Sequence, residues 1–135
     1  MVTETSAKQR LIGSWRYIGS TIDGRPRPGR GVSAKGIIIY DPHGHMACHV
    51  APDGVVPKVG KEPTGEEAKA ALANHVAYFG TYSVDETART VTHHRAGSIQ
   101  PGDSGDLVRG YEFVGDRLIL RPVGTTQEVL WERIK

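Results

Sequence analysis

The stretch from Tyr78 to Ala96, YFGTYSVDETARTVTHHRA, decides the fold because it contains two strand-like segments joined by a turn. YFGTYSV (78–84) and RTVTHHRA (89–96) are rich in β-branched and aromatic residues, and the polar sequence DETA (85–88) separates them. This pattern predicts two antiparallel strands in a hairpin. Successive side chains of a strand point to opposite faces of its sheet, so each residue of the hairpin can be assigned to one face.

Two adjacent histidines in this hairpin, His93 and His94, raise the question of a metal or catalytic site. Val91 is expected to be buried, so His93 shares its inward face while Thr92 and His94 take the other face. Histidines on opposite sides of a sheet cannot chelate one metal ion together or form a catalytic pair. The pattern therefore predicts that His93 faces the interior and His94 faces water.

Six further segments have the length and composition of strands. Turn-like sequences separate most of them, and one long loop over 23–31 holds three arginines and two prolines. Eight short strands with mostly tight links predict an all-β fold, an eight-stranded antiparallel barrel that closes and so leaves no exposed edge. The interior of such a barrel holds packed side chains or one small ligand. The six segments are GSWRYIGSTI (13–22), AKGIIIY (34–40), HMACHVA (45–51), DLVRGYEFV (106–114), DRLILRP (116–122) and TQEVLWERI (126–134).

Two helices are predicted outside the sheet. A short N-terminal helix is expected around Ser6 to Leu11. The stretch TGEEAKAALANHVAYF (64–79) has apolar residues at helical spacing, and Thr64 precedes Glu67 by three residues as in a capping box. We expect a helical insertion over about 64–78 that covers the barrel as a lid or plug.

The composition is that of a soluble globular protein with a single core. A length of 135 residues suits one domain, expected over residues 1–135. Seventeen Lys and Arg against 15 Asp and Glu leave a net charge of only +2, which gives no argument for a nucleic-acid partner. No apolar run approaches the roughly 18 residues of a membrane helix, so no membrane partner is expected.

Cysteine usage and the first residues bear on the cellular compartment. Cys48 is the single cysteine, so neither an intrachain disulfide nor a four-cysteine zinc site can form. Residues 1–10 are polar and lack the apolar core of a signal peptide. We therefore expect a cytoplasmic protein.

Four stretches of the chain resemble the bacterial lipocalin-like domain family of small, calycin-like barrels. They are LIGSWRYI (11–18), GIIIYDPHGHMACHV (36–50), HVAYFGTYSVDETARTVTHHRAGSIQP (75–101) and EVLWERI (128–134). The likeness runs from about Leu11 to Ile134, and the third stretch is long enough to be fairly specific. Gly13, Ser14 and Trp15 also match the lipocalin G-x-W signature.

The resemblance implies a fold and a general kind of function. In lipocalins the tryptophan of the signature closes one barrel end beneath an arginine of the last strand, and Arg133 is the matching candidate for a cation–π contact with Trp15. Related small barrels bind hydrophobic ligands, and some act as cofactor-free cyclases or isomerases of secondary metabolism. No catalytic motif of those enzymes is recognisable in this chain.

Alternation along the strands predicts an aromatic-lined cavity. In HMACHVA the more apolar face holds Met46, Cys48 and Val50, which places His45 and His49 outside. An apolar wall with few polar groups is the usual composition of a small-molecule site. The residues predicted to contact a ligand share an inward position on their strands, and they are Trp15, Tyr17, Ile38, Tyr40, Met46, Cys48, Tyr111, Phe113 and Trp131.

Three inward polar residues, His93, Tyr82 and Arg109, are the candidates for catalysis. His93 is a candidate general base because imidazole titrates near neutral pH, although a structural histidine fits the same position. Arg109 needs a partner carboxylate or an anionic ligand, because an unpaired buried charge is costly. Tyr82 is a candidate donor to a ligand carbonyl. Cys48 has no helix N-terminus or base beside it, which argues against a nucleophile.

Two function classes stay open on the sequence. The barrel carries or senses a small hydrophobic or aromatic molecule, or it catalyses cofactor-free isomerisation, cyclisation or dehydration of that molecule. In the second case His93 and a tyrosine act as acid and base, and Arg109 stabilises oxyanion charge. No cofactor and no metal is expected. A protein-interaction module that uses the outer sheet is a third class without a positive signal, and a homodimer stays open.

Overall fold

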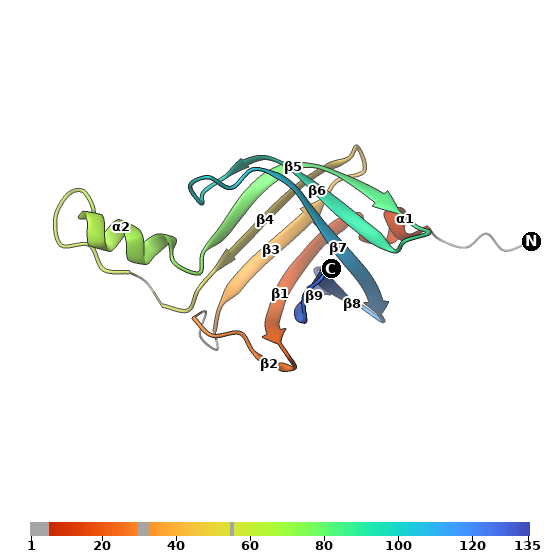
Figure 1. Cartoon of the computed structure of the whole chain (residues 1–135), viewed down its shortest axis with the longest axis horizontal. Coiled ribbons are helices and arrows are strands. Elements are labelled where there is room, and N and C mark those ends of the chain that lie inside the picture. The colour runs from red at the N-terminus through yellow and green to blue at the C-terminus, as the bar shows by residue number, and fades with distance from the viewer. Residues whose placement is uncertain (1–5, 30–32, 55) are drawn as a thin grey trace, which may run out of the picture.

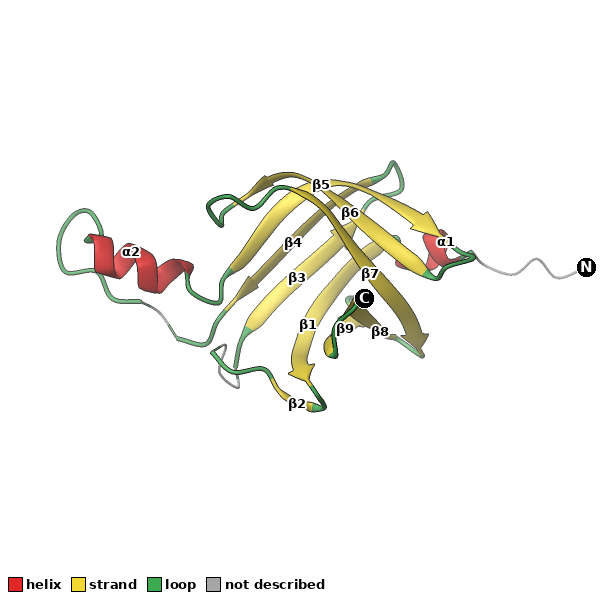
Figure 2. Cartoon of the chain, viewed as in Figure 1, coloured by secondary structure: helices red, strands yellow, loops and turns green. Residues whose placement is uncertain are grey.

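A computed structural model of the chain describes residues 6–29, 33–54 and 56–135. Its strands form one antiparallel sheet that curls around a central core (Figures 1 and 2). The strand order is β2-β1-β3-β4-β5-β6-β7-β8-β9, and an additional pairing of β1 with β9 closes the sheet. The strands are β1 (Gly13–Ile22), β2 (Arg25–Pro26), β3 (Lys35–Tyr40), β4 (His45–Ala51), β5 (Val76–Asp85), β6 (Thr90–Ser98), β7 (Gly105–Val114), β8 (Arg117–Pro122) and β9 (Gln127–Arg133).

Strand β1 closes the barrel because it pairs on both of its edges. Its first residues pair with β3, from Gly13 opposite Tyr40 to Arg16 opposite Ile37. On the other edge it pairs with β9 from Trp15 to Ile22, with a shift of register between Tyr17 and Gly19. The two-residue strand β2 only extends the end of β1, so the eight longer strands form the predicted all-β, eight-stranded antiparallel barrel. The loop expected over 23–31 contains β2, and residues 30 and 31 lie outside the described residues.

Alternation of side chains fixes which residues form the core. In β4, Met46, Cys48 and Val50 are buried while His45 and His49 are exposed, which confirms the predicted faces. Tyr40, Leu118 and Trp131 complete the same pattern on β3, β8 and β9, and each is at most 2% exposed. The interior therefore combines aliphatic side chains with aromatic ones.

One end of the barrel is closed by the helix α1 (Ala7–Leu11) and by a stack of two side chains. Leu11 is fully buried, and the indole of Trp15 donates from Nε1 to its carbonyl at 2.9 Å. The guanidinium carbon of Arg133 lies 4.1 Å from the centre of the Trp15 ring, and Nη1 donates to the Ile12 carbonyl. This confirms the predicted pair. Gly13 has a φ of +129°, and a Cβ there would lie 3.0 Å from Arg133 Nη1, so the signature needs glycine.

The helix α2 (Gly65–Leu72) lies beside the opposite, open end (Figure 1). It begins with the predicted capping box of Thr64 and Glu67, but it stops at Leu72. The prediction of a helix to about residue 78 was wrong, because residues from Val76 pair with β4 and pack the partly buried Tyr78 against the core. None of the α2 side chains is buried, so the helix is neither a plug nor a closed lid. No helix among the described residues is long and apolar enough to cross a membrane.

Replacement of Arg133 tests the closed end. Arg133→Met should lower the free energy of unfolding by about 2 kcal/mol, because it removes the cation–π contact and leaves the Ile12 carbonyl without its donor. Chemical denaturation followed by far-UV circular dichroism measures this loss. Arg117→Met is the matched control, because Arg117 is 52% exposed and its ion pair with Glu132 is long, at 3.7 Å. This variant should change the free energy of unfolding by less than about 0.5 kcal/mol. Equal losses in both variants would contradict the role given to the stack.

Candidate functional site

The two adjacent histidines of β6 lie on opposite faces of the sheet, as the alternation predicts. His93 is 1% exposed and shares the inner face with Val91. His94 points outward, where its Nδ1 lies 2.9 Å from Asp106 and its Nε2 lies 2.8 Å from the Ser83 hydroxyl. The pair therefore cannot act on one ligand. Within the described residues no group of three or more His, Cys, Asp or Glu side chains is arranged to hold a metal ion.

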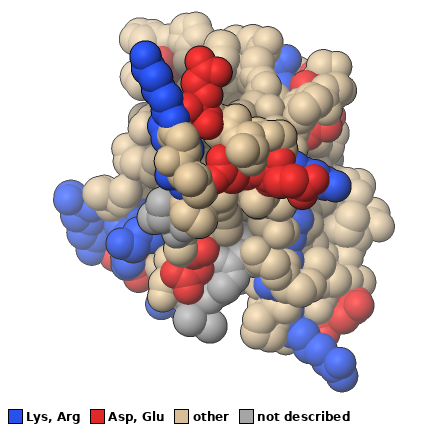
Figure 3. Space-filling model, turned by 90° about the vertical axis from the view of Figure 1, so that its left-hand side faces the viewer, with Lys and Arg blue, Asp and Glu red and all other residues tan. Residues whose placement is uncertain are grey.

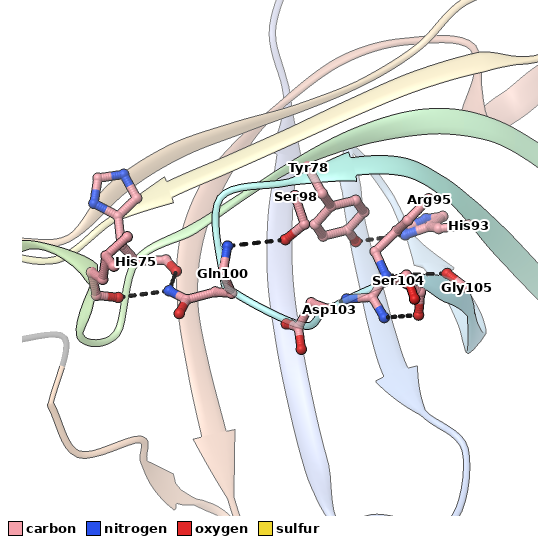
Figure 4. Close-up of polar contacts among 10 residues, drawn as sticks. His75, Tyr78, His93, Arg95, Ser98, Gln100, Asp103, Ser104 and Gly105 are labelled. Carbon is pink, nitrogen blue, oxygen red and sulfur yellow. Dashed lines mark hydrogen bonds and ion pairs between the residues drawn. The ribbon is translucent and has the colours of Figure 1, made fainter. Parts of the chain in front are cut away.

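Two tyrosines enclose the imidazole of His93 and use both of its nitrogens. The Tyr40 hydroxyl, from the last residue of β3, lies 2.6 Å from Nε2. The Tyr78 hydroxyl, from the start of β5, lies 2.7 Å from Nδ1, as Figure 4 shows. The result is a continuous Tyr40–His93–Tyr78 chain of hydrogen bonds inside the barrel.

Burial keeps all three members of this chain neutral. Loss of hydration lowers the pKa of His93 to about 3, and the nearby charge of Arg109 adds to the effect. Burial also raises the pKa of Tyr40 and of Tyr78 well above the ordinary value of a phenol. At neutral pH the imidazole is therefore uncharged and carries one N–H, and both phenols keep their protons.

The surroundings of Tyr40 decide which nitrogen of His93 carries that proton. The Tyr40 hydroxyl has no second hydrogen-bond partner among the described residues. Its O–H therefore donates to Nε2 of His93, which accepts through its lone pair. Nδ1 then carries the imidazole proton and donates it to the Tyr78 oxygen. The Tyr78 O–H then has the thiol of Cys48 as its hydrogen-bond acceptor, and a thiol accepts hydrogen bonds weakly. The chain thus ends in a hydroxyl donor at Tyr78.

A cavity of about 110 Å³ adjoins this chain inside the barrel. Most of its wall is apolar, and this apolar part comes from five of the strands and includes Ile38, Val50 and Val129. It shares Arg27 and Val76 with a larger hollow of about 830 Å³ at the open end of the barrel. The full lining of the inner cavity is Arg27, Ile38, Cys48, Val50, Val76, Tyr78, His93, Arg109, Leu120, Pro122, Gln127, Val129 and Trp131.

Arg109 brings a positive charge to the cavity wall from β7. It is half-buried, and no hydrogen bond or ion pair joins its side chain to another residue within the described ranges. Arg121 on the neighbouring strand β8, by contrast, forms ion pairs with Glu112 and Glu128 at 2.9 and 2.7 Å. The sequence left a partner carboxylate and an anionic ligand open for Arg109, and the described residues supply no carboxylate.

The open end is held by polar contacts that the sequence did not reveal (Figure 4). Gln100, in the β6–β7 loop, donates from Nε2 to the carbonyls of Leu72 and His75 at 2.6 and 2.7 Å. Arg95 donates to the carbonyl of Ser104 in the same loop and to that of Gly105, the first residue of β7. Its guanidinium carbon also lies 5.9 Å from the centre of the Tyr78 ring. The contacts of Gln100 tie the loop to the segment that precedes β5, and those of Arg95 tie it to β6. Backbone carbonyl acceptors leave no mark in the sequence.

A glycine lets β5 and β6 approach closely beside the site. Gly80 lies between Tyr78 and Tyr82 on the inner face of β5, where the register with β6 shifts. A Cβ at position 80 would lie 1.9 Å from the carbonyl oxygen of His94, so only glycine fits. The close approach brings the Tyr78 hydroxyl within reach of His93.

The structure brings together some of the residues predicted for the site and separates others. His93, Arg109, Ile38, Cys48 and Trp131 line the cavity, and Tyr40 lies behind His93. Tyr82 donates instead to the Asp41 carbonyl at 2.6 Å, outside the cavity lining. The remaining predicted residues lie elsewhere in the core, with Trp15 and Phe113 in contact at the closed end, Tyr111 against Phe113, Tyr17 against Trp131, and Met46 beside Tyr40.

A family model described as a lipocalin-like domain matches residues 12–134 of the chain. The chain belongs to the lipocalin-like domain family. Among curated protein sequences no significant match was found. A solved structure of a DUF4847 family protein from Bacteroides vulgatus is similar to this lipocalin-like barrel with a TM-score of 0.51 and 13% sequence identity, over 93% of this chain and 94% of the other. That likeness concerns the fold alone.

Acid should destabilise this lipocalin-like barrel through His93. The pKa of His93 falls from an ordinary 6.5 to about 3 on folding, so the unfolded chain binds more protons between these values. Stability is therefore complete above about pH 6.5 and is lost as the pH falls toward 3. Between pH 7 and pH 5 the native chain should lose about 2 kcal/mol more unfolding free energy than a His93→Gln variant, measured by urea denaturation.

A His94→Gln variant is the matched control for this measurement. It removes the neighbouring, outward histidine and leaves the buried one in place, so it should keep the extra acid sensitivity that His93→Gln lacks. If His93→Gln and the native chain showed the same dependence on pH, His93 would not be held neutral by burial.

Proposed function

We propose that this protein binds a small, largely apolar molecule inside its barrel, with the polar end of the molecule beside Tyr78, His93 and Arg109. The observation that carries the proposal is the cavity of about 110 Å³, whose aliphatic wall contains a few converging polar groups. Membership of the lipocalin-like family supports the same general function. The inner cavity is small beside the roughly 300–1,000 Å³ of drug-sized sites, so a larger ligand would extend into the adjoining hollow.

Binding without chemistry is the version that the electrostatics favour. A general base works best with a pKa near the working pH, whereas the pKa of His93 is about 3. The raised pKa values of Tyr40 and Tyr78 also keep these phenols from acting as bases at neutral pH. We therefore propose a carrier or sensor of a small molecule as the first function.

A cofactor-free isomerase or cyclase is the second candidate, and one observation favours it. Tyr78 and Arg109 both line the cavity, and a hydroxyl donor with a guanidinium can stabilise an enolate or similar oxyanion. In this version His93 orients Tyr78 rather than taking a proton from the substrate. Turnover that survives in a Tyr78→Phe, Arg109→Gln double variant would exclude this form of catalysis.

Binding of a neutral aromatic probe tests the proposed function. Methyl cinnamate added to ¹⁵N-labelled protein should shift the amide signals of residues around the cavity, such as Val50, Val76 and Leu120. Val129→Phe should weaken this binding at least tenfold, because the larger side chain occupies the cavity. Leu130→Phe is the matched control on the outer face of β9 and should change the affinity less than twofold.

A particular pattern of shifts would contradict the proposal. The outer face of the barrel carries exposed apolar residues, among them Phe79 and Ile99 at 58% and 47% exposure. If the probe shifted signals only around these residues, or bound equally well to Val129→Phe, it would occupy the outer sheet rather than the interior.

A further inference from the structure

We infer that the ligand of this barrel carries a carboxylate, which the guanidinium of Arg109 and the hydroxyl of Tyr78 bind together. The inference rests on the proposed function, because it names the chemical class of the molecule in the same cavity. The apolar part of the ligand would lie against the aliphatic wall and reach toward the hollow at the open end.

The first argument is that the polar groups of the cavity are mostly donors. Both nitrogens of His93 are used by tyrosines, so the imidazole offers a ligand no free acceptor. The order of protons along the chain leaves the Tyr78 O–H as a donor, with only the weakly accepting thiol of Cys48 as competitor. A ligand that satisfies these groups must present hydrogen-bond acceptor atoms.

The second argument is charge. Arg109 lines the cavity without an ion pair to any described residue, Arg27 adds a second cationic side chain, and no Asp or Glu belongs to the lining. A half-buried guanidinium gains most from a partner that is also charged, and its two parallel N–H groups match the geometry of a carboxylate. A neutral ligand would leave the charge uncompensated.

The third argument concerns where the attraction originates. Viewed toward the open end, acidic and basic side chains are interspersed and neither sign forms a continuous field (Figure 3). A net charge of +2 also gives little long-range attraction for anions. Selection for an acid must therefore come from Arg109 and its neighbours within the cavity.

Paired probes of equal shape test the inference. Cinnamate, methyl cinnamate and cinnamamide share one apolar body and differ in charge, and their affinities for the full chain at pH 7 can be measured by NMR titration. Cinnamate should bind at least tenfold more tightly than either neutral probe. Arg109→Gln should remove this preference, so that the three probes bind within about twofold of one another. Tyr78→Phe should reduce the preference for cinnamate severalfold.

Arg25→Gln is the matched control, because it removes one positive charge from exposed strand β2, outside the cavity lining. It should preserve the preference for cinnamate. Equal affinities of the native chain for all three probes would overturn the inference while leaving the proposed function intact, and this comparison needs no variant that might misfold. A preference that survives Arg109→Gln would also overturn it. If none of the probes binds, the proposed function itself fails.

Discussion

Burial of one imidazole inside a closed sheet is the constraint on which the organisation of this barrel depends. His93 is 1% exposed, so it can be accommodated only as a neutral ring with both nitrogens hydrogen-bonded. Tyr40 and Tyr78 meet this requirement from two other strands, β3 and β5. The hydroxyl of the fully buried Tyr40 has His93 Nε2 as its one hydrogen-bond partner among the described residues, so it donates its proton to Nε2 and thereby sets the direction of the hydrogen bonds. Tyr78, at the cavity wall, is left with the hydroxyl that can face a ligand.

The two barrel ends differ because their arginines have different surroundings. At the closed end the guanidinium of Arg133 lies on the Trp15 ring and donates to backbone carbonyls, so its donors are used within the fold. Toward the open end Arg109 lies beside a cavity that is lined by no carboxylate of the described residues. An arginine therefore stabilises the fold at one end, and another arginine is available to recognise a ligand at the other. This difference supports a site that takes its ligand through the open end.

Much of this fold could be predicted from the alternation of residues, but the site could be predicted only in part. The period of two correctly placed His93 inside and His94 outside, and the G-x-W motif led to the contact between Trp15 and Arg133. Tyr78 was missed because the predicted helix over about 64–78 overlapped the strand expected from residue 78, so the side chain was assigned to no face; pairing of β5 with β4 decides its position. Tyr82 lies on the same inward face of β5 as Tyr78. How far Tyr82 lies from the cavity depends on the tilt of the strands, which no local pattern encodes.

The protonation state of His93 is the most direct test of this account. The two ring nitrogens can be observed by long-range ¹H–¹⁵N NMR correlation in the native protein between pH 7 and pH 4. We expect a neutral ring throughout this range, with the proton on Nδ1 and Nε2 accepting from Tyr40. A ring that becomes doubly protonated near pH 6, or one that carries its proton on Nε2, would contradict the arrangement from which the donor at Tyr78 follows.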